Sequence, residues 1–201
     1  MIDSELLPHN LHTRGFHIID NFLETEHCKS LLQLAQEMHQ DGLFKRAKIG
    51  SNIKAHQNNT IRTDEICWLE EDSVEPEVHS YLKQTINIAN ILNQSLFLSL
   101  VEFETHFAAY QPGSFYKKHI DQFATKKTRK ISCVYYLNES WQEDFGGQLK
   151  IYDKDHHLIE TVLPIENRFI CFNSELPHEV CLTQQPRYSI AGWMKTRTIL
   201  S

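Results

Sequence analysis

The sequence predicts an α+β protein with a double-stranded β-helix (jelly-roll) core and N-terminal helices packed on one face. Three observations lead to this prediction. Helical periodicity is confined to the part of the chain before residue 96. Short β-rich runs then follow one another, separated by turn signals such as Gln111-Pro112-Gly113 and Gly146-Gly147. No helical pattern separates these runs, which favours a sandwich or jelly roll over a parallel sheet of βαβ units.

Length and composition describe an ordered domain. The chain has 201 residues, of which 41% are hydrophobic and 23% are charged, as in ordinary globular proteins. We expect a single domain over residues 1–201, with residues 1–95 as N-terminal support and residues 96–197 as the jelly-roll core. Five cysteines without a C-x-x-C pair argue against zinc ribbons and redox dithiols and favour a reducing, cytoplasmic location.

Two classes of partner are not expected. The net charge of −6 is a poor match to a phosphate backbone, which argues against nucleic acid. No apolar run approaches the ~18 residues of a transmembrane helix, which argues against a membrane. The chain begins with the acidic segment Met1–Glu5, which lacks the pattern of a secretory signal.

The N-terminal part begins with a strand and a helix. Phe16–Phe22 has the composition of a short strand. From Glu24 onward, apolar residues recur at helical spacing until Asp41-Gly42. The residues of this stripe are Leu31, Leu34, Ala35 and Met38.

A long polar loop, a strand and a second helix complete this part. Residues 47–60 are polar and contain Gly, Ser and Asn, so we expect a mobile loop that binds substrate. Residues 61–69 return to a strand pattern. A second helix opens near Ser73 and Pro76. Its apolar stripe consists of Val78, Leu82, Ile86 and Ala89.

The second half of the chain is expected to supply eight short strands. Their ranges are 97–110, 115–121, 130–137, 147–153, 158–163, 168–172, 178–182 and 187–196. Cys133 and Cys171 lie inside two of these runs, where we expect them to be small buried side chains.

Two H-x-D triplets indicate where a metal ion could bind. They are His39-Gln40-Asp41 and His119-Ile120-Asp121. Residues two apart point in nearly opposite directions on a helix but share a face on a strand. The first triplet ends the first helix, so only His119 and Asp121 can hold one ion together. With His178 from a later strand they form a set of two histidines and one carboxylate, which suits a mononuclear Fe(II) centre with open positions.

An arginine lies nine residues after the third candidate ligand. Arg187 opens the last strand, where a buried guanidinium is costly unless it meets an anion. A dicarboxylate co-substrate would supply a bidentate partner. These residues favour an Fe(II) oxygenase. They leave open a cupin-like metal-binding protein with different chemistry, such as a hydrolase or isomerase, and a non-catalytic metal sensor.

Several segments around these residues match a known family. In chain order they are Ile61–Trp68, Tyr110–Asp121, Val134–Asn138 with Trp141, Gly146–Leu149, Pro177–Val180, and Arg187-Tyr188 ahead of Trp193. In these segments the chain resembles the 2-oxoglutarate- and Fe(II)-dependent prolyl 4-hydroxylases, and among them the hypoxia-inducible-factor prolyl hydroxylases and their bacterial relatives. The resemblance spans roughly residues 16–196.

The resemblance implies a role for each matching residue. The iron ligands, which form the catalytic centre, would be His119, Asp121 and His178. The 2-oxoglutarate site would consist of Arg187, Tyr136, Tyr110 and Leu149. The residues that bind the protein substrate would be Arg129, Trp193, Arg62 and Asp64. One residue departs from the pattern, because Ala191 stands where the animal hypoxia enzymes have a threonine, and this removes one hydrogen bond near 2-oxoglutarate.

The implied activity is hydroxylation of a prolyl residue at C4 in a protein substrate, with succinate and CO2 as products. The implied cofactors are Fe(II), 2-oxoglutarate and O2, with ascorbate as a candidate reductant. Bacterial relatives suggest a translation elongation factor as the substrate, and the hypoxia enzymes suggest an oxygen-responsive role. Within the enzyme class, the alternative is a hydroxylase of another protein side chain or of a small molecule.

Overall fold

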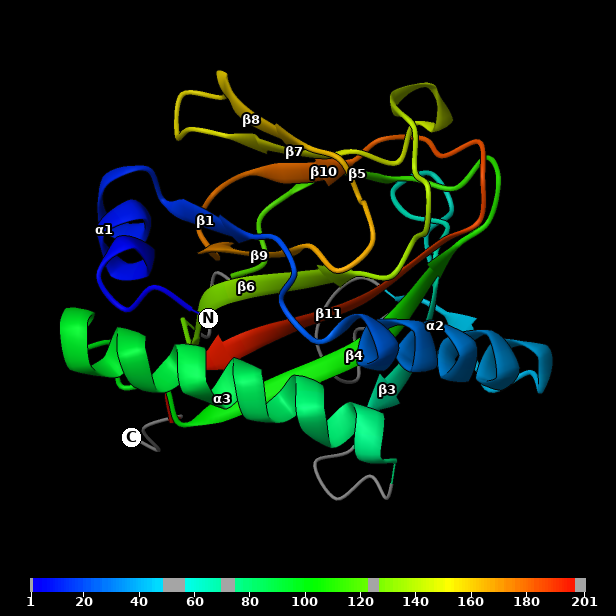
Figure 1. Ribbon diagram of the computed structural model, residues 1–201. Coiled ribbons are helices and arrows are strands. Elements are labelled where there is room, and N and C mark those ends of the chain that lie inside the picture. The colour runs from blue at the N-terminus through cyan, green and yellow to red at the C-terminus, as the bar shows by residue number, and fades with distance from the viewer. Residues whose placement is uncertain (1, 49–56, 70–74, 123–126, 198–201) are drawn as a thin grey trace.

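The computed structural model describes residues 2–48, 57–69, 75–122 and 127–197 (Figure 1). In Figure 1 a smaller sheet lies at the top, a larger sheet in the middle and two long helices at the bottom. The larger sheet has 7 strands in the order β1-β9-β6-β11-β4-β3-β2, and the smaller has 4 in the order β5-β10-β7-β8. Neighbouring strands run antiparallel in both sheets. This arrangement confirms the predicted jelly roll.

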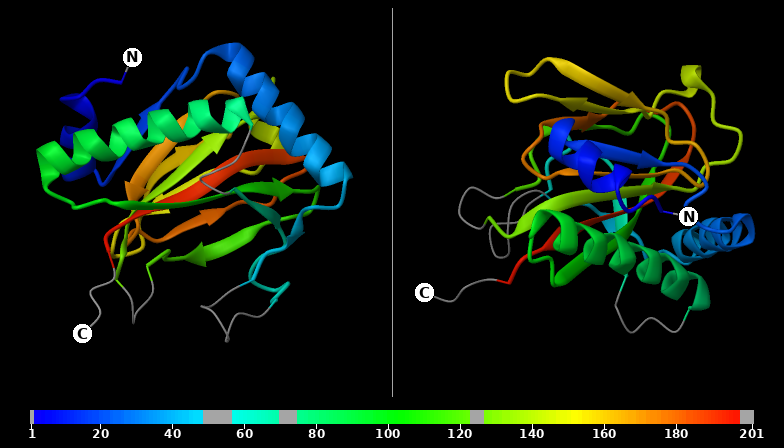
Figure 2. Two further views of the ribbon diagram at one scale, coloured as in Figure 1. Left: turned by 90° about the horizontal axis from the view of Figure 1, so that it is seen from below. Right: turned by 60° about the vertical axis from the view of Figure 1, so that its left-hand side comes forward.

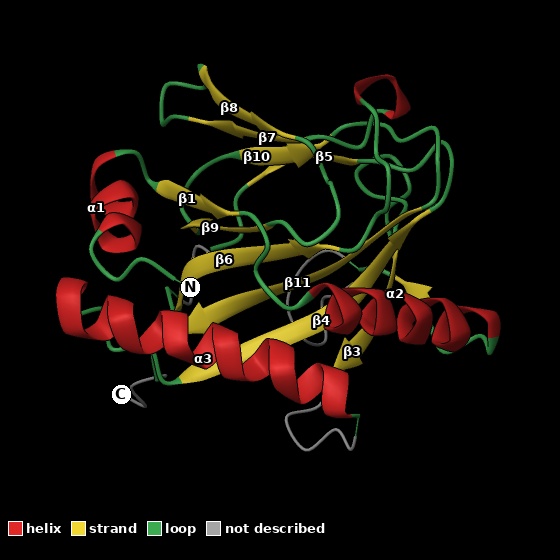
Figure 3. Cartoon of the chain, viewed as in Figure 1, coloured by secondary structure: helices red, strands yellow, loops and turns green. Residues whose placement is uncertain are grey.

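The expected elements appear in the predicted order along the chain, with an additional helix at residues 6–13 and an additional short strand at residues 45–46 (Figure 3). The helices are α1 (Leu6–Thr13), α2 (Thr25–Gln40) and α3 (Pro76–Leu96), with a 3-10 turn at Glu143–Phe145. The N-terminal strands are β1 (Phe16–Ile19), β2 (Lys45–Arg46) and β3 (Glu65–Leu69). The later strands are β4 (Glu102–Tyr110), β5 (Tyr116–His119), β6 (Arg129–Tyr136), β7 (Leu149–Tyr152), β8 (Leu158–Val162), β9 (Phe169–Asn173), β10 (His178–Val180) and β11 (Arg187–Lys195). Each of the eight expected runs overlaps one of them, and the largest difference is at β4, which begins five residues after the start of the expected run 97–110.

Two hydrophobic clusters lie on opposite faces of the larger sheet. Because side chains alternate along a strand, Phe107 and Ala109 of β4 face the helices, whereas Ala108 and Tyr110 face the smaller sheet. Helices α2 and α3 cover the outer face, as the left view of Figure 2 shows. The inner face and the smaller sheet enclose the space in which the candidate site lies.

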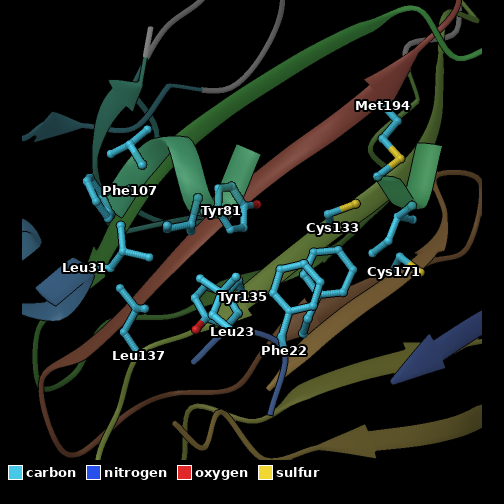
Figure 4. Packing of buried hydrophobic residues seen from close by; sticks show 14 of the residues in the cluster. Phe22, Leu23, Leu31, Tyr81, Phe107, Cys133, Tyr135, Leu137, Cys171 and Met194 are labelled. Carbon is cyan, nitrogen blue, oxygen red and sulfur yellow. The ribbon is translucent and has the colours of Figure 1, made fainter. Parts of the chain in front are cut away.

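The helix-facing cluster is rich in aromatic side chains and thiols (Figure 4). Phe22 stacks on Phe169 with ring centroids 4.3 Å apart. Cys133 and Cys171 are buried in this cluster, as expected, and all five cysteines are free thiols. Burying a large apolar side chain contributes about 1.5–3 kcal/mol. The helix-facing cluster therefore stabilises the larger sheet, whose opposite face lines the site.

The helices differ from the sequence prediction in two respects. Helix α1 was not among the expected elements, and it buries Leu7, Pro8 and Leu11. In α3 the predicted stripe is partly wrong, since Ile86 is 55% exposed. The buried residues of α3 are Val78, Tyr81, Thr85, Ile88 and Leu92. The buried face of the helix thus includes Tyr81 and Ile88 and leaves out Ile86.

Some expectations fall on residues that the structure leaves undescribed. Most of the expected loop 47–60 is residues 49–56, and Ser73 lies in 70–74; both segments are outside the described residues. Within the described part, β3 begins at Glu65, four residues later than the predicted strand. No helix among the described residues is long and apolar enough to span a membrane.

Candidate active site

Two strands of the smaller sheet bring the predicted triad together. His119 ends β5 and His178 begins β10, and the two residues pair directly across the antiparallel strands. Asp121 follows β5 by two residues, and its carboxylate lies 3.5 Å from Nε2 of His119 and 3.4 Å from Nε2 of His178. One ligand atom from each of the three residues lies within 4.8 Å of the others. Two imidazoles and a carboxylate in this arrangement could hold one divalent metal ion.

The backbone orients both imidazole rings. Nδ1 of His119 lies 2.7 Å from the carbonyl oxygen of Lys117, and Nδ1 of His178 lies 2.9 Å from that of Leu176. A carbonyl oxygen can only accept, so each Nδ1 carries the proton and donates it. Each Nε2 is therefore left to face Asp121. Metal-binding histidines are commonly held in this way.

Ser132 fixes the carboxylate of Asp121, and Ser174 in turn contacts Ser132. The hydroxyl of Ser132 donates to Oδ2 of Asp121 at 2.7 Å, and it lies 2.9 Å from the hydroxyl of Ser174. Burial alone would raise the pKa of Asp121, but His178 and His119 hold that pKa well below its usual range. Burial and the neighbouring His178 lower the pKa of His119. Burial would lower the pKa of His178, but the neighbouring Asp121 raises that pKa overall. The ionised carboxylate of Asp121 suits a cation.

The triad opens into a cavity of about 710 Å³ between the two sheets. Its wall includes Arg187, the first residue of β11, whose side chain is buried. The guanidinium donates from Nε to the carbonyl oxygen of Gly147 at 3.0 Å and from Nη1 to the hydroxyl of Ser189 at 3.3 Å. No carboxylate of the described residues lies within salt-bridge distance of it. A buried cation without a counter-ion points to an anionic ligand.

Further groups near Arg187 complete this pocket. The rings of Tyr110 and Tyr136 lie 4.8 and 5.1 Å from its guanidinium carbon. The hydroxyl of Tyr136 is buried and finds no hydrogen-bond partner within the described part of the chain. Tyr110 and Leu149 line the cavity, and Tyr136 lies next to Arg187 without being one of the lining residues. An unpaired guanidinium edge beside an unpaired buried hydroxyl fits a carboxylate ligand.

The four predicted substrate residues also line this cavity. Arg62 and Asp64 form a two-point ion pair, with Nε of Arg62 2.7 Å from Oδ1 of Asp64. Asp64 is only 1% exposed, so it reaches the cavity chiefly through Arg62. Arg129 lies over the Trp193 ring at 3.5 Å and also contacts Glu104 at 3.2 Å.

Several residues of the cavity wall had no role in the sequence prediction, and three of them are polar or aromatic groups close to the proposed site. They are Ser189, His106 and Trp68. Trp68 lies against His106 with ring centroids 4.9 Å apart. Burial lowers the pKa of His106 to about 4, and its Nδ1 has no partner among the residues that the structure describes. The signal for Ser189 was its position two residues after Arg187 on one strand, which places both side chains on one face.

This fold and this site define a class of protein. A jelly roll with two histidines and one carboxylate at a cavity shared with a buried, unpaired arginine is the arrangement of a non-haem Fe(II) oxygenase that uses a dicarboxylate. Residues 105–195 match the model of the 2OG-Fe(II) oxygenase superfamily.

Known proteins narrow the class to a family. The chain is similar to a Pseudomonas putida prolyl-4-hydroxylase structure, with 32% identity, 98% of this chain and 100% of that chain covered, and a TM-score of 0.87. It is also similar to a Trichoplax adhaerens prolyl hydroxylase solved with a hypoxia-inducible-factor peptide, with 29% identity, 96% and 88% covered, and a TM-score of 0.86. Mouse prolyl hydroxylase EGLN3 is 27% identical over 91% of this chain and 79% of its own length.

The chain belongs to the 2-oxoglutarate- and Fe(II)-dependent prolyl 4-hydroxylase family. It is a 2-oxoglutarate-dependent dioxygenase, and the cofactors of this family are Fe(II), 2-oxoglutarate and O2. The residues described above fit these cofactors. The triad offers the donor set for iron, and the unpaired Arg187 with the unpaired Tyr136 hydroxyl offers a carboxylate site.

Proposed function

We propose that this enzyme hydroxylates C4 of a prolyl residue in a protein substrate and produces succinate and CO2. The observation that carries the proposal is a single cavity lined by the metal-binding triad, the buried Arg187 and the Arg129–Trp193 pair. The likeness to prolyl hydroxylases, one of them solved with a protein-derived peptide, supports proline as the target.

In this proposal His119, Asp121 and His178 hold Fe(II) and form the catalytic centre. The iron, with 2-oxoglutarate and O2, supplies the oxidising chemistry, and ascorbate is a candidate reductant. The chain supplies the geometry. The carbonyl oxygens of Lys117 and Leu176 fix the two rings, and Ser132 fixes the carboxylate.

Arg187 and its neighbours bind 2-oxoglutarate. The guanidinium pairs with the carboxylate that is remote from the metal, and the Tyr136 hydroxyl donates to the same group. Tyr110 and Leu149 form apolar wall beside it and exclude water. The hydroxyl of Ser189 accepts from Arg187, which leaves its own proton for the ligand. Ser189 thus offers the pocket a hydroxyl that Ala191 does not.

The substrate peptide binds at Arg129, Trp193, Arg62 and Asp64. The indole of Trp193 and the neighbouring Trp68 present flat apolar faces suited to a pyrrolidine ring. Lys48 and Arg62, which lie on either side of the undescribed residues 49–56, also line this cavity. We propose a translation elongation factor as the first substrate to test, an oxygen-responsive role, and a cytoplasmic location, which free thiols favour.

The test uses the iron-loaded enzyme, 2-oxoglutarate, O2 and purified elongation factor, followed by a proteome of denatured cytoplasmic proteins. Peptide mass spectrometry locates any added oxygen atom, and amino-acid analysis separates 4-hydroxyproline from its isomers. The proposal predicts 4-hydroxyproline formed in step with succinate, and no product with His178→Ala. Oxygen added only to other side chains, or to small molecules, contradicts it.

A further inference from the structure

Residues 61–64 run beside the strand that carries the metal site. The backbone N–H of Thr63 donates to the carbonyl oxygen of Phe115 at 3.1 Å, and that of Lys117 donates to Ile61 at 2.8 Å. Arg62 pairs with Tyr116 as an antiparallel bridge. The chain leaving the expected substrate loop is therefore bonded directly to β5, which ends at His119.

A stack of three side chains crosses this junction. The Tyr116 ring lies parallel to the His119 ring, with centroids 3.5 Å apart and an angle of 13° between the planes. The guanidinium of Arg62 lies over the Tyr116 ring at 4.2 Å. Both groups are too close to share one face of that ring, so Tyr116 lies between them.

The far end of the stack is anchored by an ion pair. Arg62 donates two hydrogen bonds to the carboxylate of Asp64, which is buried. A two-point guanidinium–carboxylate pair fixes orientation as well as distance. Arg62 therefore holds a defined position over Tyr116 rather than sampling many rotamers.

The stack supplies a restraint that the hydrogen bond on His119 does not. The bond from Nδ1 of His119 to the Lys117 carbonyl fixes one point of the ring, and the ring plane still needs a second contact. The ring of His178 lies 4.2 Å away at an angle of 56°, which does not define a plane. The parallel face of Tyr116 does.

Resting on the proposed metal site, we infer that Tyr116 is a positioning residue for His119, held in place by Arg62 and Asp64. The stack couples the substrate-side segment 61–64 to metal affinity. Coupling of this kind is reciprocal, so an ion at the triad also stabilises segment 61–64. Arg62 and Asp64 do not belong to the triad, and the route inferred for their effect on the metal is the contact of Arg62 with Tyr116.

The experiment titrates chelator-stripped enzyme with Co(II) in competition with a chromophoric chelator and records the visible absorption of the bound ion. We expect Tyr116→Leu to bind Co(II) about tenfold more weakly with a shifted spectrum, as for other groups that orient metal ligands. Tyr116→Phe keeps the aromatic ring and should retain the wild-type Co(II) affinity and the wild-type spectrum. Asp64→Asn should weaken binding in the same direction as Tyr116→Leu, by a smaller factor.

A matched control removes a tyrosine ring from another strand. Tyr188 lies on the helix-facing side of β11 and bonds to His39, so Tyr188→Leu should leave Co(II) affinity unchanged. Wild-type affinity in Tyr116→Leu and Asp64→Asn overturns the inference, as does an equal loss in Tyr116→Phe. If Tyr116→Leu does not fold, Asp64→Asn decides alone. Failure of the wild type itself to bind Co(II) removes the proposed metal site, which is a separate result.

Hydrogen exchange tests the reciprocal effect. The amides of Thr63 and Lys117 join the two segments, so their exchange should slow when Co(II) is added to the wild type. In Tyr116→Leu at saturating Co(II), that slowing should be smaller. If the exchange rates of these amides in the wild type are the same with and without Co(II), the coupling is contradicted.

Discussion

Replacement of Arg187 tests the proposed 2-oxoglutarate pocket most sharply. The wild-type guanidinium is buried and donates one hydrogen bond to the carbonyl oxygen of Gly147 and one to the hydroxyl of Ser189. It has no carboxylate partner in the described part of the chain. In Arg187→Lys the charge remains, but the planar fork that binds a carboxylate at two points is lost. Arg187→Met removes the charge as well and leaves the carbonyl of Gly147 without its donor.

The expected magnitude follows from the number of bonds. A hydrogen bond to a charged group contributes about 1.5–3 kcal/mol, which is about a ten- to hundredfold change in Kd. Arg187→Lys loses one such bond to the ligand, so its Kd for 2-oxoglutarate should rise by about tenfold. Arg187→Met should reach about a hundredfold, because it also loses the charge.

Calorimetric titration of 2-oxoglutarate into Mn(II)-loaded enzyme measures these affinities without turnover. Arg168→Lys is the matched control, since Arg168 is a partly exposed arginine that pairs with Asp20 at 2.6 Å. Its Kd for 2-oxoglutarate should equal that of the wild type. Unchanged affinity in both Arg187 variants would refute the assignment of Arg187 as the anchor.

Two further predictions concern stability. Gly146 has φ +72°, and a Cβ there would clash with the carbonyl oxygen of Leu182, so Gly146→Ala should lower the free energy of unfolding by about 2 kcal/mol or more, measured in urea. Burial lowers the pKa of His106 from 6.5 to about 4, so between these values the unfolded chain binds a proton that the folded chain does not, and stability should fall as pH drops through that window. Urea unfolding at about pH 7 and pH 5 should show a smaller loss for His106→Phe than for the wild type, whereas equal losses would contradict the buried, neutral imidazole.

Alternation and turn residues made the strands predictable from the sequence. In β11, Arg187, Ser189, Ala191 and Trp193 line the cavity while Ile190 and Met194 face the helices, and this alternation is visible in the sequence. The helices were less predictable. A stripe drawn through aliphatic residues placed Ile86 inside, because it ignored the aromatic Tyr81, which is fully buried.

Within the site, spacing grouped His119 with Asp121 on the expectation of one strand over 115–121. In the structure β5 ends at His119, and Asp121 lies two residues beyond it with its carboxylate still directed at both histidines. Other site residues depend on which strands are neighbours. His106 meets the cavity because β4 lies between β3 and β11 and places His106 beside Trp68 and opposite Ala191. The stack of Arg62 on Tyr116 requires two segments over 50 residues apart to pair. A local sequence pattern does not show which distant segments pair or in what register, so these contacts could be found only in the structure.

The most direct test of the proposed cofactor site is an anaerobic titration of metal-free enzyme with Fe(II) and 2-oxoglutarate. A visible charge-transfer band appears when 2-oxoglutarate chelates Fe(II). The wild type should develop this band, and His119→Ala, which loses one of the three proposed ligands, should not. Iron that binds the wild type without producing the band, or an unchanged band in His119→Ala, would contradict the assignment of this cavity to Fe(II) and 2-oxoglutarate.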